Sequence, residues 1–512
     1  MILRSWRVIK VLALFTYSPA FAQQVALPPD TLSVKRFVTD VLWSDSLCIR
    51  QSYSSFDQTR YTALNGVTTF RGGPYRNTAS WGFLEKRPDS LVIKWEFSTG
   101  ADREWGGGAG WTGQPNVVQW PDSLRQVMKL SEAVKNDALF TEVIQPSLDG
   151  KIYFLDLATG RASRPPINIQ NPIKGSPAVD PRGYPLLYCG QGINRSGEFG
   201  FRVFSLLDGK KLYTLNGRDP FAHRTWGAFD GAPLIDAAND RLVVAGENGV
   251  LYSADLHTQY NSDSARITVR PQVNRYRYRK PEGTRQGIEN SVAAFSNLLY
   301  FADNDGNLQA VDVATLQPVW FHHNHDDTDA TLVLDIPDSI PYLYTGSEVD
   351  LQGNKGFTYL KKINGLNGTT VWARKYPCFS IRGAHPVNGG MLSTPVSGKQ
   401  TARHLLVASI SRYGSIDKGL LVAINKETGE ECWKRELDHY AWSSPLDIYD
   451  REGNMYIFLA DSRGHVMLID GATGDLMFQK KIADLFEASP VAFNNQIIIA
   501  SRPRKVFCLE VR

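Results

Sequence analysis

The sequence predicts an all-β fold, an eight-bladed β-propeller of four-stranded antiparallel blades. In residues 442–482, four short runs rich in Val, Ile, Tyr and Phe are separated by Gly, Asp and Asn, which is typical of consecutive antiparallel strands. Similar units recur roughly every 40–50 residues, the spacing of propeller blades. The last unit lacks a fourth strand, whereas residues 91–100 are a fourth strand without a unit. Pairing these two ends closes the ring and removes its open strand edges.

The composition is that of a globular chain with many turns. The 512 residues include 43 Gly and 27 Pro, with 21% charged and 42% hydrophobic residues. The net charge of +4 is small for this length, so we expect no nucleic-acid partner. The five cysteines are far apart in the sequence and predict neither a zinc site nor a disulfide framework.

The N-terminus predicts export. Arg4, Arg7 and Lys10 precede a short apolar run, and Ala20-Phe21-Ala22 has the form of a signal-peptide cleavage site. The run is far shorter than the ~20 residues that a spanning helix needs, so no membrane anchor is expected. We expect a soluble, monomeric protein in a periplasm or outside the cell. The predicted organisation is a signal peptide over 1–22, an irregular lead-in over 23–90 and a single propeller over 91–512.

The repeat has a recognisable form. A unit begins with Ser-Pro before an apolar strand and continues with a DG turn, an Asp, a Thr-Gly turn and a Trp. The residues that carry this pattern include Asp149-Gly150, Asp156, Thr159-Gly160, Trp372, Thr428-Gly429, Trp433, Asp470 and Thr473-Gly474. The pattern resembles the pyrroloquinoline-quinone-type (PQQ-type, quinoprotein-like) propeller repeat, and residues 70–82 resemble the lead-in of such proteins. The resemblance covers about residues 70–512. It implies the propeller fold, but it says little about activity, since the repeat also builds non-enzymatic outer-membrane assembly scaffolds.

The repeated residues have structural roles in this interpretation. We expect Trp320, Trp372 and Trp433 to lie between neighbouring blades and to donate their indole N–H groups to turns. The glycine of each Thr-Gly turn supplies a backbone position with positive φ. Function should therefore depend on residues that differ between units.

One set of variable residues is expected to surround the mouth of the central channel, because the first strand of each blade is innermost. These residues lie three positions before the Ser-Pro proline or its equivalent, and they are Thr112, Lys174, Asp230, Glu289, Asp329, Leu392, Trp442 and Glu487. Neighbouring carboxylates repel one another unless a cation, a cationic ligand group or an arginine lies nearby. Asp230, Glu289 and Asp329 are therefore candidate metal ligands. The alternative is that these carboxylates are simply solvated.

The loops between blades should share one face with these residues. They concentrate arginines and aromatic residues, which suit anionic or sugar-like ligands through stacking and bidentate hydrogen bonds. Arg224, Trp226, Arg382 and His385 from these loops complete the candidate ligand-binding set with Lys174, Trp442 and Glu487. A separate His-rich tract over 322–327 is expected to be a polar surface turn, although Asp326 and Asp327 with Asp329 could contribute to a calcium site.

The favoured function is a non-enzymatic, exported binding or scaffolding propeller whose partner is a protein segment or a glycan. No catalytic motif such as G-x-S-x-G occurs, and no cofactor is required. The resemblance implies one alternative, a quinoprotein dehydrogenase of an alcohol or sugar that uses calcium and PQQ. This chain has no adjacent cysteine pair of the kind that such enzymes commonly use, and only Asp230, Glu289 and Asp329 are candidates for the calcium and base roles.

Overall fold

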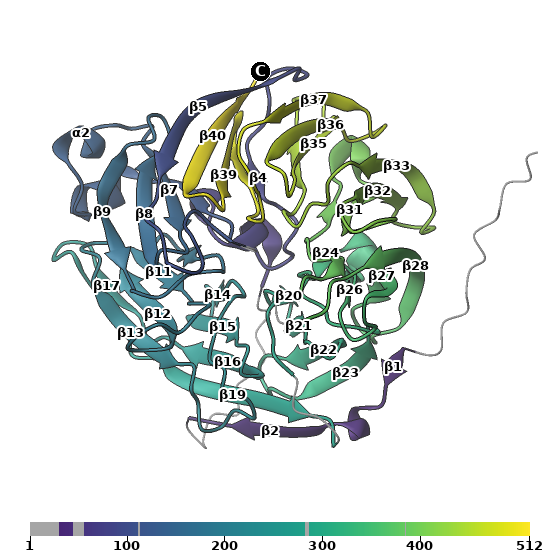
Figure 1. The fold of residues 1–512 in the computed structure, drawn as a ribbon. Helices are drawn as coiled ribbons and strands as arrows, with labels where there is room; N and C mark the ends of the chain where they lie inside the picture. Colours follow the sequence, from purple (N-terminus) through teal and green to yellow (C-terminus); the bar gives the residue numbers. More distant parts are fainter. Residues whose placement is uncertain (1–29, 45–55, 111–112, 282–285, 384–385) are drawn as a thin grey trace, which may run out of the picture.

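The computed structural model describes residues 30–44, 56–110, 113–281, 286–383 and 386–512. The predicted signal peptide lies outside these residues. The described chain forms eight antiparallel sheets around a common axis, which confirms the eight-bladed all-β propeller (Figure 1). Within the described chain, helix is restricted to short segments, and none is long and apolar enough to cross a membrane. These segments are α1 (Asp122–Val127), α2 (Glu132–Lys135), η1 (Val34–Arg36), η2 (Gln58–Arg60), η3 (Phe70–Gly72), η4 (Pro337–Ser339) and η5 (Gln400–Ala402).

Each blade takes its strands in chain order from the axis outward (Figure 1). Blades 1 and 2 contain β6 (Asn116–Gln119), β7 (Thr141–Pro146), β8 (Lys151–Asp156) and β9 (Ala162–Asn168), then β10 (Ala178–Val179), β11 (Leu186–Cys189), β12 (Gly200–Ser205) and β13 (Lys211–Asn216). Blades 3 and 4 contain β14 (Leu234–Asp236), β15 (Arg241–Ala245), β16 (Val250–Asp255) and β19 (Gln272–Arg279), then β20 (Ala293–Phe295), β21 (Leu298–Ala302), β22 (Asn307–Asp312) and β23 (Pro318–His323). A hairpin of β17 (Gln259–Asn261) and β18 (Arg266–Thr268) lies between β16 and β19.

The second half of the ring repeats this arrangement. Blades 5 and 6 contain β24 (Val333–Asp335), β25 (Tyr342–Thr345), β27 (Lys355–Asn364) and β28 (Thr370–Phe379), then β30 (Val396–Ser397), β31 (Leu405–Ser411), β32 (Gly419–Asn425) and β33 (Glu431–Leu437). Blades 7 and 8 contain β34 (Leu446–Tyr449), β35 (Met455–Ala460), β36 (His465–Asp470) and β37 (Leu476–Lys481), then β38 (Val491–Phe493), β39 (Gln496–Ser501) and β40 (Lys505–Val511). Two further short strands, β26 (Glu348–Val349) and β29 (Gly389–Gly390), pair with each other beside blade 6.

The two ends of the propeller meet in blade 8. β5 (Leu91–Ser98) pairs antiparallel with β40, so that Leu91 lies opposite Val511. The strand expected from residues 91–100 therefore lies on the outer side of the last unit. Buried side chains fill the spaces between blades, and one cluster joins Ile457 of β35 to Val407 of β31. Burying an aliphatic side chain of this size stabilises the fold by about 1.5–3 kcal/mol.

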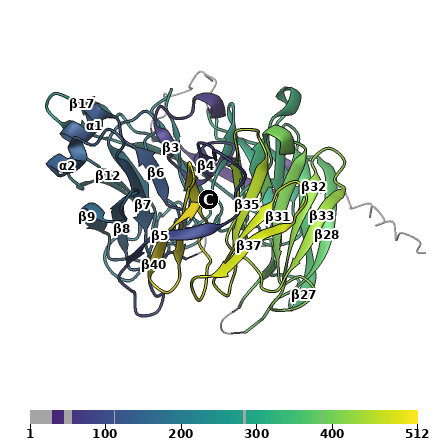
Figure 2. The ribbon, with the colours of Figure 1, turned by 90° about the horizontal axis from the view of Figure 1, so that it is seen from above.

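The described part of the lead-in contains four short strands. β1 (Thr31–Leu32) pairs with β23, and β2 (Val38–Leu42) pairs with β19, so both extend the outer sides of blades. β3 (Asn65–Val67) and β4 (Ser80–Trp81) instead pair with the innermost strands β6 and β38. Figure 2 shows β3 and β4 between the blades. These strands depend on pairing with distant segments, and this is why the local sequence gives no sign of them.

Two buried arginines connect the lead-in to the inner strands. Arg71 donates from Nη1 to the carbonyl of Pro445 and from Nη2 to that of Pro395, both at 3.0 Å. Arg76 donates from Nε to Val292 and from Nη2 to Ala232, both at 2.9 Å. Burial lowers the pKa of each arginine to about 10, so both guanidinium groups remain charged at neutral pH. The lead-in therefore holds together the starts of blades 3, 4, 6 and 7.

The prediction for the repeated tryptophans is confirmed. Trp320, Trp372 and Trp433 donate from Nε1 to the carbonyls of Gly365, Lys426 and Gly471 at 2.8, 3.0 and 3.1 Å. Each of these carbonyls belongs to the following blade. The indoles therefore lie between neighbouring blades and connect them by hydrogen bonds.

Candidate functional site

Six carboxylates gather on the face of the propeller that carries the inter-blade loops. Asp230, Glu289 and Asp329 precede first strands, as the alignment of the units predicts. The other three are Glu247 in the turn between β15 and β16, Asp327, and Glu348 in β26. Asp230, Glu247 and Glu289 each offer an oxygen atom within 4.8 Å of the other two. We call the six residues the acidic cluster.

Lys174 neutralises one side of the acidic cluster, where its Nζ forms an ion pair with Asp230 Oδ2. Burial lowers the pKa of Lys174, but attraction to Asp230, Glu247 and Glu289 outweighs this effect and leaves the pKa above its usual value. Burial, together with repulsion from Glu289 and Asp230, raises the pKa of Glu247 well above its usual range. One ammonium group thus faces three carboxylates.

The other side of the acidic cluster has only neutral hydrogen-bond donors. Asn304 Nδ2 donates to Glu289 Oε1 at 2.9 Å and to Asp327 Oδ2 at 3.3 Å. Asp327, Asp329 and Glu348 form no ion pair with a Lys, Arg or His among the described residues. Burial raises the pKa of all three well above the usual range, and so does repulsion from neighbouring carboxylates. This side therefore carries uncompensated negative charge whenever its carboxylates ionise.

Four oxygen atoms of the acidic cluster are buried without a hydrogen-bond partner in the described structure. They are Asp230 Oδ1, Glu247 Oε1, Asp327 Oδ1 and Glu348 Oε1. These residues are between 1% and 8% exposed, so solvent does little to satisfy them. An unsatisfied buried polar group costs about 1–3 kcal/mol, and a charged group costs more. A hard cation such as calcium prefers oxygen ligands of this kind, and its charge would offset the repulsion.

Arg224, which was predicted from the loops, is linked to the acidic cluster through Asn304, and it lines a pocket together with the predicted Trp226. Arg224 Nη1 donates at 3.0 Å to Asn304 Oδ1, and Asn304 in turn binds Glu289. The indole of Trp226 meets the ring of Phe199 edge-on, with 5.2 Å between the ring centroids. Arg224, Trp226 and Phe199 line a pocket of about 570 Å³. This pocket provides aromatic surface and guanidinium groups.

The remaining predicted residues have separate partners. Arg382 forms an ion pair with Asp350 and donates from Nη2 to the carbonyl of Val349 at 3.3 Å, next to Glu348. Glu487 accepts from Arg502 Nη1 at 2.6 Å. Trp442 lies 5.7 Å from the ring of Tyr440, and its buried indole N–H has no acceptor among the described residues. Thr112 and His385 lie outside the described residues. The structure thus brings Lys174, Asp230, Glu289 and Asp329 together but shows no contact of Glu487 or Trp442 with them.

The interpretation of the His-rich tract as a surface turn is wrong. His322, Asn324 and Asp326 are fully buried. His322 shares hydrogen bonds with Gly368 and Lys361, while Lys361 Nζ pairs with Asp30 Oδ2 at 3.0 Å. Pairing of β1 with β23 places Asp30 beside these groups and so covers the tract, which no local pattern predicts.

Sequence reasoning missed Glu247 and Glu348, and it named Asp327 only as a possible calcium ligand with Asp326 and Asp329. It considered only the loops between blades, whereas the turn between the second and third strands of a blade lies on the same face. Glu247 occupies such a turn, and Glu348 follows β25 in the corresponding part of blade 5. An acidic residue in the turn between the second and third strands of a blade could therefore have indicated these further members of the acidic cluster.

Comparisons with known proteins agree with this fold. The family model described as "Outer membrane protein assembly factor BamB" matches residues 356–481. Quinohemoprotein alcohol dehydrogenase ADHIIG from Pseudomonas putida HK5 has a TM-score of 0.58 at 14% identity, over 90% of this chain and 83% of that chain. Quinohemoprotein alcohol dehydrogenase from Comamonas testosteroni has a TM-score of 0.58 at 11% identity, over 87% and 80%. BamB from Moraxella catarrhalis has a TM-score of 0.48 at 17% identity, over 72% and 93%. No curated protein sequence matches this chain.

The family model and the two alcohol dehydrogenase structures agree with the resemblance seen in the repeats. At these identities, the solved structures show a shared fold and no more. This protein is therefore a β-propeller, and residues 356–481 within it match the BamB family model.

Proposed function

We propose that the protein is an exported, non-enzymatic binding or scaffolding propeller that holds its partner on the face with the inter-blade loops. Residues 1–22 act as the signal peptide in this proposal, and residues 91–512 form the binding propeller. The observation that carries the proposal is the acidic cluster, in which six carboxylates face a single lysine and four buried oxygen atoms lack partners. Such an arrangement is costly to maintain unless a cationic group is bound to it.

The cation that best suits the acidic cluster is calcium. Carboxylate oxygens from Asp230, Glu289 and Asp329, joined by Glu247, Asp327 and Glu348, supply the hard ligands that calcium prefers. The ammonium group of Lys174 already pairs with Asp230. A calcium ion should therefore bind preferentially on the other side, where Asp327, Asp329 and Glu348 have no positively charged ion-pair partner among the described residues. A bound calcium ion would also offer coordination positions to hydroxyl or carboxylate groups of a glycan or protein segment in the neighbouring pocket.

Calcium titration of protein first treated with EGTA tests this site. We expect saturable heat in isothermal titration calorimetry, and we expect Glu289→Gln and Glu348→Gln to weaken binding at least tenfold. Glu436→Gln on β33 is the matched control, since Glu436 is exposed and lies outside the acidic cluster. Absence of calcium binding at millimolar concentration would remove the cation from the proposal.

Capture of partners tests the binding function itself. Cross-linking in the exported fraction, followed by purification, should retain a specific protein, or a glycan array should show a specific ligand. Glu289→Gln and Trp226→Ala should reduce retention, whereas Glu436→Gln should not. If neither experiment finds a ligand, the binding function is refuted.

The quinoprotein alternative receives less support from the geometry. The quinone carries three carboxylates, whereas the described residues around the acidic cluster are predominantly acidic. Two arginines near the acidic cluster are already engaged, Arg224 with Asn304 and Arg382 with Asp350. Incubation with calcium and the quinone distinguishes the two functions. A bound chromophore and dye reduction that depends on an alcohol or sugar would establish the dehydrogenase instead.

A further inference from the structure

Four junctions between blades are closed in the same way. The indoles of Trp95, Trp320, Trp372 and Trp433 each donate to a carbonyl in the next blade. Each ring also covers the glycine of that blade's turn, and these glycines are Gly160, Gly368, Gly429 and Gly474. A Cβ atom added to any of the four would come within 2.5–2.7 Å of the ring. An aromatic ring therefore fills the space between the blades at these junctions.

The junction between blades 1 and 2 departs from this pattern. Its residue at the tryptophan position is Arg164, four residues after Gly160. Arg164 Nη1 still donates to the next blade, to the carbonyl of Leu206 at 2.7 Å. Its other nitrogens, however, bind the fully buried Glu142, and its guanidinium lies 4.2 Å from the centre of the Phe154 ring. Arg164 thus makes the hydrogen bond but leaves the space of the indole empty.

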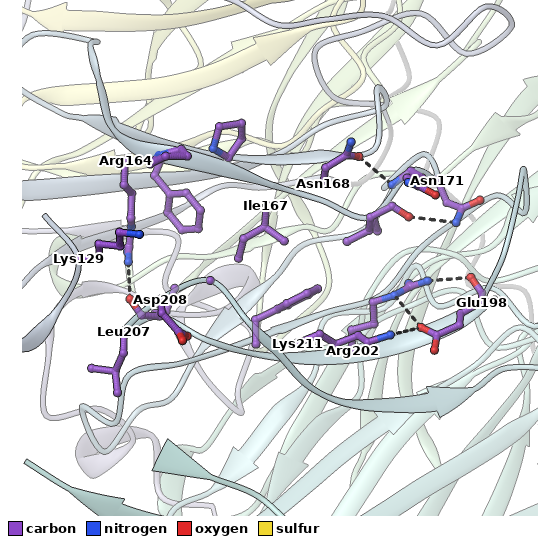
Figure 3. Close-up of a pocket in the computed structure, with 18 of the residues that line it drawn as sticks. Lys129, Arg164, Ile167, Asn168, Asn171, Glu198, Arg202, Leu207, Asp208 and Lys211 are labelled. Carbon is purple, nitrogen blue, oxygen red and sulfur yellow. Dashed lines mark hydrogen bonds and ion pairs between the residues drawn. The ribbon is translucent and has the colours of Figure 1, made fainter. Parts of the chain in front are cut away.

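The consequence is visible at Gly209, the turn glycine of blade 2. A Cβ atom added there would meet only Ile167 Cγ1, at 3.7 Å. A groove of about 650 Å³ lies at this junction (Figure 3). Its apolar lining consists of Phe154, Pro165, Pro166, Ile167, Ile169, Phe204, Leu206 and Leu207. Apolar side chains therefore form one part of the lining of this groove, at the place where an aromatic ring sits in the four junctions with tryptophan.

Basic residues lie at both ends of this groove, and Asp208, which pairs with Lys210, lies at the end with Lys129. Figure 3 shows Lys129 and Arg164 at one end, and Arg202 and Lys211 at the other, with Ile167 between them. Glu198 is already shared by Lys211 and Arg202, whose Nε lies 4.0 Å away. The exposed Lys129 forms no ion pair among the described residues. A partner with acidic groups beside its apolar anchor complements these ends.

The outer strand of blade 1 does not favour strand addition. β9 lies at the edge of its sheet, but Pro165 and Pro166 have no N–H groups to pair with an incoming strand. A partner should therefore dock through a side chain inserted between the blades.

We propose that this groove binds an acidic segment of another protein through one aromatic side chain. The aromatic ring takes the place that an indole fills in four sister junctions, while one carboxylate of the partner pairs with Lys129 and another competes with Glu198 for Lys211. The groove lies between outer strands, away from the acidic cluster at the axis. This binding is therefore separate from the proposed function and needs no calcium.

A labelled peptide tests this proposal. The probe is a fluorescein-tagged peptide with one tryptophan between acidic residues, and its fluorescence anisotropy is followed with the full propeller in EGTA. We expect saturable binding that weakens about tenfold or more when the tryptophan of the peptide becomes alanine. Replacing its acidic residues by lysine should abolish binding, and added salt should weaken it.

Variants of the propeller locate the site. Ile167→Trp fills the groove while leaving Arg164 and Glu142 paired, and it should abolish binding. Lys129→Glu with Lys211→Glu changes two exposed side chains and should weaken binding at least tenfold even if the filled variant does not fold. Lys434→Glu with Lys480→Glu, on the outer strands of blades 6 and 7, makes the same charge change elsewhere and should bind like the wild type.

Three results would overturn the proposal. They are absence of saturable binding at millimolar peptide, binding that is indifferent to the loss of the peptide tryptophan, and unchanged affinity in the folded Lys129→Glu, Lys211→Glu variant. Loss of calcium binding in the acidic cluster has no bearing on these outcomes, since the assay contains EGTA.

Discussion

Replacing Glu247 with glutamine measures how much the repulsion between carboxylates in the acidic cluster destabilises the folded protein. Glu247 has an oxygen atom within 4.8 Å of oxygens from both Asp230 and Glu289. At an effective dielectric constant of about 20, two unit charges about 5 Å apart repel by roughly 3 kcal/mol. Glu247 takes part in two such repulsions, and attraction to Lys174 offsets about one of them. The glutamine variant should therefore be more stable than the wild type by about 3 kcal/mol when Glu247 is ionised.

The pH dependence has a definite sign. Burial raises the pKa of Glu247, and repulsion from Glu289 and Asp230 raises it further. The folded state thus holds this proton more tightly than the unfolded state, so the wild type loses stability as pH rises above the usual glutamate range. At pH 4 the residue is protonated in both states and the substitution should have little effect. The gain should grow as pH rises from 4 to 8.5.

Urea unfolding in EGTA, followed by tryptophan fluorescence, measures this difference as a shift in midpoint. Glu436→Gln provides the matched control for loss of one exposed carboxylate. With calcium at about one hundred times its Kd, the wild type should gain about 2.7 kcal/mol and the variant should gain less. A Glu247→Gln variant that is destabilised at pH 8.5, or shifted equally at both pH values, would refute the reasoning.

Three further predictions concern the scaffold. Arg76→Met leaves the buried carbonyls of Val292 and Ala232 without their charged donor and should lower the free energy of unfolding by at least about 3 kcal/mol; a loss below about 1 kcal/mol in urea unfolding would contradict this role. Gly429→Ala and Gly209→Ala place a Cβ on similar left-handed backbone, at φ 73° and 76°. The first Cβ meets Trp372 at 2.7 Å and should lower the melting temperature clearly more than the second, which costs only about 1–2 kcal/mol of backbone strain; equal losses would show that the groove at Gly209 is filled. Burial and the charge of Lys361 lower the pKa of His322 to about 3, so stability is lost as pH falls below about 6.5, where the unfolded histidine takes up a proton. Hydrogen exchange of the β1 and β23 amides, corrected for intrinsic rates, should accelerate between pH 7 and 4.5, and unchanged protection would exclude the effect.

Much of the fold could be predicted because each blade is local in sequence. In residues 442–482, alternating apolar runs and glycine turns identify four strands, and the structure places β34, β35, β36 and β37 there. The repeat also predicted the role of Trp372 and Trp433, since a residue that recurs in each unit makes the same contact at each junction. The lead-in could not be predicted in this way, because β1 and β3 exist only through partners fifty or more residues away.

The sequence by itself determined the ring, the closing strand, the acids Asp230, Glu289 and Asp329 of the acidic cluster, and Lys174, which neutralises one side of it. These follow from the register of the repeat, which assigns each residue a fixed place relative to the axis. Only the tertiary structure decided that Glu247 and Glu348 join them and that Trp442 makes its contacts elsewhere. Only the structure, too, showed that Arg164 binds Glu142 and so leaves a groove between two blades. The physical reason is that register determines where a backbone lies, whereas charge pairing and burial between side chains depend on neighbours that the ring brings from other blades.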